Sequence, residues 1–259
     1  MPSCSPTLAA RTGAPNTADG SRNTFTCADE SAHYAFSVCM LLQQYRDHLP
    51  WRAEGVVELG SGDASAIADV VRTVPELRVH GYDISPASVD RARQNIAERG
   101  VGDRYTVELG DFFDQADSAA GPRPSTAISN PPYIPAPSRD ILMPELWGGE
   151  FGNDLTLQLL KAGHRHVIVA LPSYADPVTT LATARDAGYR VVNFLAMGLD
   201  FGQYSSEPVV RRQIERICAE GRGWAGPDEY MVAVALLTQD PDVPGDREPQ
   251  LMRALQLHG

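Results

Sequence analysis

Paired cysteines are absent from this chain of 259 residues. Its four cysteines stand apart, without the Cys-x-x-Cys spacing that brings thiolates together around a metal ion. Unpaired thiols are typical of proteins in a reducing compartment, where disulfides seldom form. The cysteines (Cys4, Cys27, Cys39 and Cys218) therefore predict free thiols and no metal site.

Long apolar runs are absent as well. No stretch of about 18 apolar residues occurs, so the sequence predicts no membrane-spanning helix and no membrane partner. The first residues lack the apolar core of a signal peptide. Together with the scattered cysteines, these absences lead us to expect a cytoplasmic protein.

Positive charge is in short supply. The chain has 22 lysines and arginines against 33 acidic residues, which gives a formal net charge of −11. An acidic protein is a poor match for a phosphate backbone, and the most compact basic cluster (Arg211, Arg212 and Arg216) is small. The charge balance therefore disfavours nucleic acid as a partner. The apolar content of 43% is ordinary for a globular protein.

The order of the remaining patterns predicts one α/β domain between two tails. Small and polar residues dominate 1–30, which we expect to be a flexible tail, and apolar residues at helical spacing predict a helix over 31–52. From 53 to 240, short apolar strands alternate with helices, as in a parallel sheet covered on both faces. Within this range, 198–229 form an insertion with an amphipathic helix. The prolines in 241–259 suggest a second tail.

The most informative stretch follows the fourth predicted strand and reads Asn130-Pro131-Pro132-Tyr133. The Asn130 side chain carries an acceptor oxygen, and the stiff prolines can aim the Pro131 carbonyl beside it. Two neighbouring acceptors suit one planar NH2 group. Tyr133 adds an aromatic face that can stack on a planar substrate or stabilise a developing cation. The same residues could also form only a turn after a strand.

Other polar residues and glycines also follow predicted strands. Gly60 and Gly62 follow the first strand, Asp83 the second and Asp111 the third. Because ligands of parallel sheets bind outside the carboxyl ends of the strands, these residues and Asn130 should converge on one crevice.

These residues match the parts of a nucleoside that carries an amino acid. Glycines let the backbone approach a ligand closely, and Asp83 lies at the distance in sequence typical of an acidic residue that accepts ribose hydroxyls. Asp111 could accept an adenine N–H, with Phe112 against the ring, while Glu58 would face a ligand ammonium. Simpler roles stay open, because Asp83 could cap a helix, although Ser85 suits that role better, and Asp111 could belong to a turn.

Three segments of the chain resemble the class I S-adenosylmethionine-dependent methyltransferases. They are 58–62, 82–86 and 129–135, the last with the Asn-Pro-Pro-Tyr motif. Within that class the chain is similar to the glutamine N5-methyltransferases that modify peptide-chain release factors, which also carry a Gly-Gly-x-x-Gly element like that at 148–152. The resemblance implies a Rossmann-like, seven-stranded and mostly parallel sheet with helices on both faces and the last strand antiparallel.

The resemblance also implies a cofactor, an acceptor and the residues that hold them. S-adenosylmethionine is the expected cofactor, and a protein glutamine side chain is the expected methyl acceptor. The expected catalytic residues are Asn130, Pro131 and Tyr133. The expected cofactor-binding residues are Glu58, Gly60, Gly62, Asp83, Ile84, Asp111, Phe112 and Asn130.

The sequence departs from the family pattern at two places. Ala64 replaces a third glycine, which we expect to cost little because alanine needs only a slightly wider approach. In place of the separate helical domain of the bacterial release-factor enzymes, the chain has one predicted helix and a tail. We therefore expect the insertion 198–229 to take part in recognising the acceptor.

In the expected mechanism, Asn130 and the Pro131 carbonyl hold the two N–H groups of the target nitrogen in line with the methyl group. Such orientation can supply roughly 7–11 kcal/mol of a reaction barrier. Alternatives within the class are methylation of a small-molecule amine or amide and of a nucleic acid base. Alternatives outside it are a non-catalytic S-adenosylmethionine-binding protein and an NAD-dependent oxidoreductase, although the latter's fingerprint needs a glycine where Ser65 stands.

Overall fold

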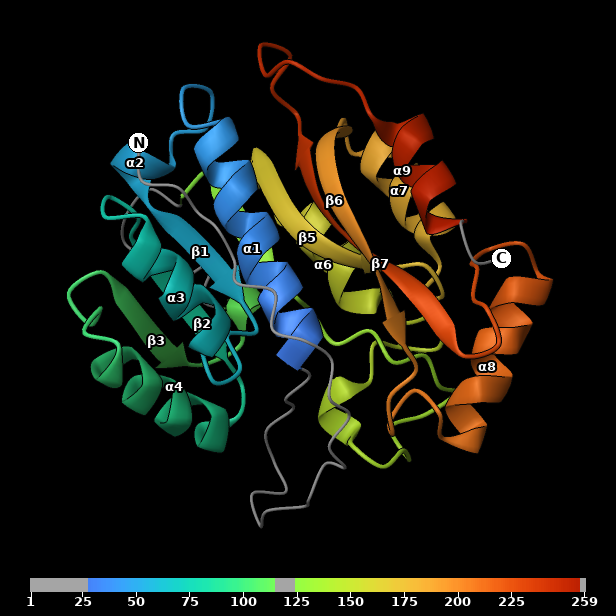
Figure 1. The fold of residues 1–259 in the computed structure, drawn as a ribbon. Helices are drawn as coiled ribbons and strands as arrows, with labels where there is room; N and C mark the ends of the chain where they lie inside the picture. Colours follow the sequence, from blue (N-terminus) through green and yellow to red (C-terminus); the bar gives the residue numbers. More distant parts are fainter. Residues whose placement is uncertain (1–27, 115–123, 257–259) are drawn as a thin grey trace, which may run out of the picture.

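The computed structural model describes residues 28–114 and 124–256 and shows a single seven-stranded sheet (Figure 1). The strand order is β3-β2-β1-β4-β5-β7-β6, and β7 runs antiparallel to both of its neighbours. The mostly parallel sheet with an antiparallel last strand is therefore confirmed. The strands are β1 (Val56–Leu59), β2 (Val79–Asp83), β3 (Tyr105–Leu109), β4 (Thr126–Ser129), β5 (His166–Pro172), β6 (Arg190–Asp200) and β7 (Glu229–Thr238).

The central strands are buried on both faces. Successive side chains of a strand point to opposite faces, so Val56 contributes to one hydrophobic cluster and Val57 to the other. Likewise Ile128 and Ala127 of β4 divide between the two clusters. These runs read as continuous apolar stretches because helices cover both sides of the sheet.

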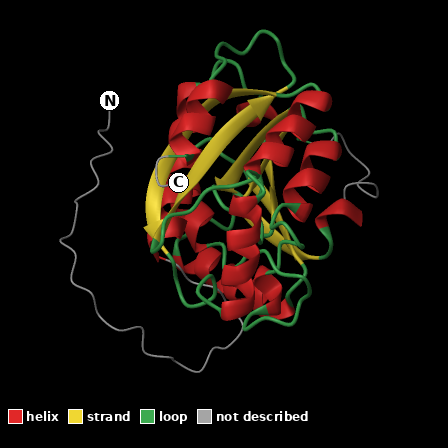
Figure 2. Cartoon of the chain, turned by 90° about the vertical axis from the view of Figure 1, so that its right-hand side faces the viewer, coloured by secondary structure: helices red, strands yellow, loops and turns green. Residues whose placement is uncertain are grey.

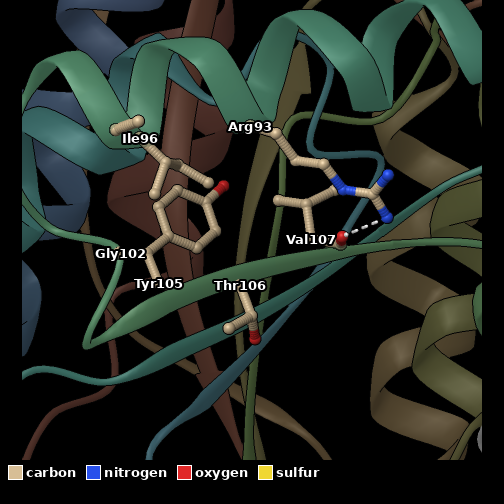
Figure 3. Close-up of a pocket in the computed structure, with 7 residues that line it drawn as sticks. Arg93, Ile96, Gly102, Tyr105, Thr106 and Val107 are labelled. Carbon is tan, nitrogen blue, oxygen red and sulfur yellow. Dashed lines mark hydrogen bonds between the residues drawn. The ribbon is translucent and has the colours of Figure 1, made fainter.

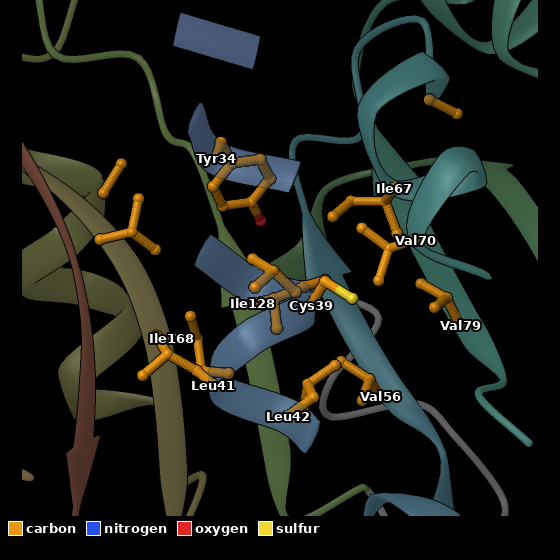
Figure 4. Packing of buried hydrophobic residues seen from close by; sticks show 14 of the residues in the cluster. Tyr34, Cys39, Leu41, Leu42, Val56, Ile67, Val70, Val79, Ile128 and Ile168 are labelled. Atoms are coloured by element: carbon orange, nitrogen blue, oxygen red, sulfur yellow. The ribbon is translucent and has the colours of Figure 1, made fainter. Parts of the chain in front are cut away.

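One face is covered by α1 (Ala28–Gln44), α3 (Ser65–Thr73) and α4 (Pro86–Glu98). Figure 4 shows side chains of α1 and α3 meeting those of the strands, with Leu41 near Ile168 and Leu42 near Val56. Val38, Leu41 and Leu42 are fully buried, and each such side chain contributes about 1.5–3 kcal/mol. Apolar burial therefore holds α1 firmly against the sheet.

The opposite face is covered by α6 (Asp154–Lys161), α7 (Pro177–Asp186) and α9 (Glu248–Leu255), and the turned view shows helices on both sides of the strands (Figure 2). The α9 helix lies where the sequence suggested a tail over 241–259. Leu251 and Leu255, one helical turn apart, are fully buried against this face. The prolines suggested a tail, but the burial of these two leucines holds 248–255 against the sheet as a helix.

Two other predicted boundaries differ from the structure. The helix expected over 31–52 is two helices, α1 and α2 (Trp51–Glu54), because the chain turns between them. The insertion expected over 198–229 is shorter, since β6 continues to Asp200 and pairs there with Glu229. The insertion thus spans 201–228 and contains α8 (Pro208–Ala219). The tail predicted over 1–30 lies almost wholly outside the described residues.

Candidate active site

The carboxyl ends of β1, β2 and β4 lie level with one another. Leu59 pairs with Tyr82 on one side and with Ser129 on the other. The Ser129 hydroxyl also donates to the Leu59 carbonyl at 2.9 Å. Gly60 and Asn130 directly follow β1 and β4, and Asp83 is the last residue of β2, so the three residues lie at the same edge of the sheet.

The glycine turn after β1 is fastened to Asp83. Gly60 and Gly62 have φ angles of 71° and 55°, a region that glycine enters at no steric cost. The Gly62 N–H donates to Asp83 Oδ2 at 2.8 Å, and the Ser85 N–H donates to Oδ1 at 2.8 Å. Burial raises the pKa of Asp83, and these two hydrogen bonds oppose the rise. A carboxylate has about four acceptor positions, so Asp83 retains the capacity to bind further hydroxyl groups.

Asp83 is not the cap of α4. Ser85 is the N-cap residue, and its hydroxyl accepts the Ser88 N–H at 3.3 Å. Asp83 instead joins the ends of β1 and β2 through backbone N–H groups. A role for Asp83 in binding a ligand is therefore compatible with its contacts.

Ala64 adopts a left-handed backbone conformation, with φ of 59° and ψ of 2°. From the sequence, alanine is expected to cost little here, because only the approach of a ligand to the chain is considered. The cost lies instead in the backbone, because a Cβ atom in this conformation clashes with the following carbonyl. This position favours glycine for its φ angle.

Glu58 is buried near the end of β1, where its carboxyl accepts a hydrogen bond from the Tyr105 hydroxyl. Burial raises the pKa of Glu58 to about 8, although the hydrogen bond from Tyr105 lowers it. The neutral acid therefore predominates at pH 7. Binding of a ligand ammonium by Glu58 stays a prediction, and such a ligand would have to share the carboxyl with Tyr105.

The remaining predicted cofactor-binding residues differ in exposure. Ile84 is 71% exposed at the end of β2, so its side chain is free to contact a ligand. Phe112 is only 2% exposed and packs edge-on against Tyr82 and Phe113. Asp111 is exposed, and its Oδ1 accepts the Phe113 N–H at 2.8 Å. Asp111 therefore makes a hydrogen bond within a turn, which is the simpler role that the sequence left open. Its contact with adenine stays a prediction.

The Asn-Pro-Pro-Tyr stretch is in contact with α1 through Glu30, a residue that sequence reasoning missed. The Asn130 Nδ2 group donates to Glu30 Oε1 at 2.8 Å, and the Tyr133 hydroxyl donates to Glu30 Oε2 at 2.5 Å. Burial raises the pKa of Glu30, and these two hydrogen bonds oppose the rise. A buried acidic residue in the first turn of a helix has no sequence signal of its own, because such residues usually stabilise the helix N-terminus.

The two ends of the Asn130 side-chain amide have different surroundings. Its Nδ2 group is bonded to Glu30, whereas its Oδ1 atom is buried without a hydrogen-bond partner among the described residues. Buried acceptors are rarely left unpaired in native proteins. The unpaired oxygen is thus a candidate acceptor for an N–H group of a ligand. Pro131, beside it, is buried.

The Gly148-Gly149-x-x-Gly152 element packs against the same stretch. A Cβ atom at Gly148 would lie 2.6 Å from the Tyr133 Cα atom, and one at Gly152 would lie 2.5 Å from the Tyr133 carbonyl. Backbone hydrogen bonds join Gly148 to Ile134 and Ile134 to Leu146. The glycines are therefore required for close backbone contact, which supports Tyr133 from behind.

A surface hollow of about 290 Å³ lies away from this edge (Figure 3). It lies between the carboxyl end of α4 and the beginning of β3, where Ile96, Gly102 and Tyr105 line it. Arg93 donates to the Val107 carbonyl beside it. None of the predicted site residues lines the hollow, so it does not mark the candidate site.

Within the described residues, no group of histidine, cysteine, aspartate or glutamate side chains could hold a metal ion. Nor is any helix in 28–114 or 124–256 long and apolar enough to cross a membrane.

Comparison with known proteins supports the resemblance inferred from the motifs. Residues 52–122 match a family model described as a methyltransferase domain. The release factor glutamine methyltransferase of Gloeobacter violaceus is 32% identical over 150 residues, which cover 52% of this chain and 51% of that protein. That of Thermosynechococcus vestitus is 28% identical over 159 residues, covering 55% and 54%. The chain spans about half the length of the curated relatives it matches.

A second group of relatives has a different named substrate. The ribosomal protein uL3 glutamine methyltransferase of Bordetella pertussis is 28% identical over 142 residues, covering 51% of this chain and 44% of that protein. Among solved structures, a protein of Pyrococcus horikoshii provisionally described as an RNA methyltransferase aligns with a TM-score of 0.50 and 13% identity. The alignment covers 79% of this chain and 81% of that one, and it supports the Rossmann-like fold. The chain thus resembles S-adenosylmethionine-dependent methyltransferases.

Proposed function

We propose that this protein is an S-adenosylmethionine-dependent N-methyltransferase whose acceptor is a carboxamide nitrogen, as in a glutamine side chain. The observation that carries the proposal is the unpaired Asn130 Oδ1 atom, with Nδ2 bonded to Glu30, at the sheet edge shared by the glycine turn and Asp83. Relatives named for glutamine methylation support the choice of acceptor.

The glycine turn and its neighbours fit the cofactor. A Cβ atom added at Gly60 or Gly62 would meet no atom within 4 Å, so the space in front of the turn is open. Asp83 retains acceptor positions for ribose hydroxyls, and the exposed Ile84 offers an apolar surface for adenine. When bound, S-adenosylmethionine supplies an electrophilic methyl group.

Asn130 has the main role in orienting the acceptor. Its Oδ1 atom accepts one N–H of the target nitrogen, and the Pro131 carbonyl accepts the other. The hydrogen bonds to both acceptors become stronger as the nitrogen becomes positively charged, so the acceptors stabilise the transition state more than the bound substrate. The buried Tyr133 closes one side of the site and excludes water.

A labelling experiment tests this proposal. The protein is incubated with methyl-labelled S-adenosylmethionine and a panel of glutamine-containing peptides, and mass spectrometry locates the added methyl group. We expect label on the side-chain nitrogen of glutamine. If label appeared only in the small-molecule fraction of a cell extract, the protein would still be a methyltransferase, but its acceptor would be a small molecule instead of a glutamine side chain. No transfer to peptide, protein or extract would contradict the proposed activity.

Variants of Asn130 test the role of its side chain. We expect Asn130→Ala to lower kcat by about 10²–10³-fold, the usual effect of removing one preorganised polar group. Asn130→Asp keeps an acceptor oxygen and should retain partial activity. Both variants should bind S-adenosylmethionine like the wild type, as calorimetry would show. Wild-type turnover by Asn130→Ala would mean that the stretch is only a turn.

A further inference from the structure

Glu30 is a buried carboxylate far from Asn130 in sequence and in direct contact with it. Its side chain is 2% exposed, and the two hydrogen bonds it accepts, from Asn130 and Tyr133, join α1 to the loop after β4. Burying an ionised group is costly unless it is paired or hydrogen-bonded. The placement of a carboxylate here therefore calls for a role beyond packing.

The chemistry of a carboxylate determines which way the Asn130 amide faces. Both carboxyl oxygens of Glu30 act as acceptors, one for the Asn130 side chain and one for the Tyr133 hydroxyl, whereas an amide has one accepting end and one donating end. Asn130 must therefore turn its NH2 group toward Glu30, and its oxygen must face the other way. An alanine or a leucine at position 30 would leave both orientations open.

We propose that Glu30 is a positioning residue that orients the Asn130 amide so that Oδ1 faces the methyl acceptor. This inference rests on the proposed function, because Oδ1 is the atom that would receive the acceptor N–H. The unpaired state of Oδ1 among the described residues agrees with it. Glu30 also accepts from the Tyr133 hydroxyl and so holds both polar side chains of the stretch in one arrangement.

A purely structural role for Glu30 is the competing explanation. The α1 helix, however, already buries Val38, Leu41 and Leu42 against the sheet. Apolar side chains at such positions stabilise a helix without the desolvation penalty of a charge, and replacing buried ionic groups with apolar ones is often neutral or stabilising. Orientation of Asn130 is the contribution that an apolar residue could not make.

Nuclear magnetic resonance of the side-chain amides tests the geometry without any acceptor. The Asn130 signal is assigned by its loss in Asn130→Asp. In the wild type we expect this signal to lie downfield of the signals of solvent-exposed asparagine amides. We also expect its protons to exchange slowly with solvent, because Nδ2 donates to a buried carboxylate. Glu30→Gln should shift the signal, and Glu30→Ala should make its exchange fast. A rapidly exchanging Asn130 signal that neither variant changes would overturn the inference.

Kinetics with the peptide that accepts label from the wild type test the consequence. Glu30→Ala should lower kcat about 10²-fold with little change in the KM of the cofactor. Glu30→Gln should have a smaller effect, since its amide oxygen can still accept from Asn130. In the Asn130→Ala background, Glu30→Gln should have no further effect, because coupled residues are not additive.

Val38→Ala is the matched control on the same helix. It should destabilise the protein by creating a cavity but leave kcat unchanged, because the apolar Val38 side chain has no acceptor with which to orient the Asn130 amide. An equal loss of kcat in Val38→Ala and Glu30→Ala would reduce Glu30 to a structural role. Absence of methyl transfer by the wild type would instead contradict the proposed function, and the amide signal would still decide the geometry.

Discussion

At the residue scale, Ala64 stores backbone strain at the beginning of α3. A non-glycine residue in the left-handed region costs about 1–2 kcal/mol, and part of that is recovered because alanine restricts the unfolded chain more than glycine does. We expect Ala64→Gly to raise the free energy of unfolding by about 0.5–1 kcal/mol. Urea unfolding measures this change.

Ala87→Gly is a suitable control for Ala64→Gly, because Ala87 lies in the first turn of α4 with no left-handed conformation. Glycine in a helix is less favourable than alanine. Ala87→Gly should therefore destabilise the protein. A loss of stability in both variants would show that Ala64 is not strained.

Glu58 should give the protein a pH-dependent stability. Its folded-state pKa of about 8 lies above the ordinary glutamate value of 4.5. The stability that the neutral acid contributes is therefore complete below pH 4.5 and is lost as the pH rises toward 8. Within this window the loss is about 1.4 kcal/mol per pH unit.

The Glu58→Gln variant isolates this effect, because glutamine keeps the size and cannot ionise. The difference in unfolding free energy between wild type and variant should fall steadily from pH 5 to pH 8. Unfolding in urea at several pH values provides the measurement. A constant difference across that range would show that Glu58 has no raised pKa.

At the element scale, α8 is connected to the loop behind the candidate site. Gln213 is buried and donates to the Glu150 carbonyl at 2.8 Å, and Glu150 lies within the glycine element that packs against Tyr133. The apolar face of α8, with Val210, Ile214 and Ile217, is buried as well. Removing the whole insertion would expose this face, so a single substitution is the better test of its role.

We expect Gln213→Ala to raise the KM of the acceptor while the affinity for cofactor stays the same. Loss of a buried hydrogen bond costs about 1–3 kcal/mol, and each 1 kcal/mol that weakens acceptor binding corresponds to about a fivefold rise in KM. Steady-state kinetics and calorimetry measure the two quantities. Glu215→Ala, on the exposed side of α8, should change neither. An unchanged acceptor KM in Gln213→Ala would limit α8 to packing.

At the scale of the whole molecule, a bound cofactor should stabilise the fold. The glycine turn follows β1 and Asp83 ends β2, so a ligand that contacts both links the ends of two strands. At 100 times its dissociation constant, S-adenosylmethionine should add about 2.7 kcal/mol. For a protein of this size, that raises the melting temperature by roughly 5–10 °C.

NAD is the control ligand in this thermal experiment. It should have no effect, because Ser65 stands where the dinucleotide fingerprint has its third glycine. Asp83→Ala should reduce the shift caused by S-adenosylmethionine. A shift with NAD alone would favour the oxidoreductase alternative and contradict the proposed cofactor.

The sequence by itself determined the fold class and the edge of the sheet at which the candidate site lies. Alternating strands and helices lead to a parallel sheet, and the carboxyl ends of its strands meet at one edge by topology alone. Gly60, Asp83 and Asn130 could therefore be placed together without coordinates. The elements α3, α4 and β3 are likewise encoded locally, because their periodicity and flanking residues are properties of neighbouring positions in the chain.

Only the tertiary structure decided which side chains contact one another across long distances in sequence. Glu30 meets Asn130 because α1 crosses the sheet, and no local pattern encodes that pairing. The conformation of Ala64 and the burial of Glu58 likewise depend on the elements around them. Leu251 and Leu255 form a helix because β6 and β7 offer an apolar face to cover, which a stretch rich in proline could not reveal. Periodicity is a property of neighbouring residues, whereas hydrogen bonds and burial depend on the packed whole.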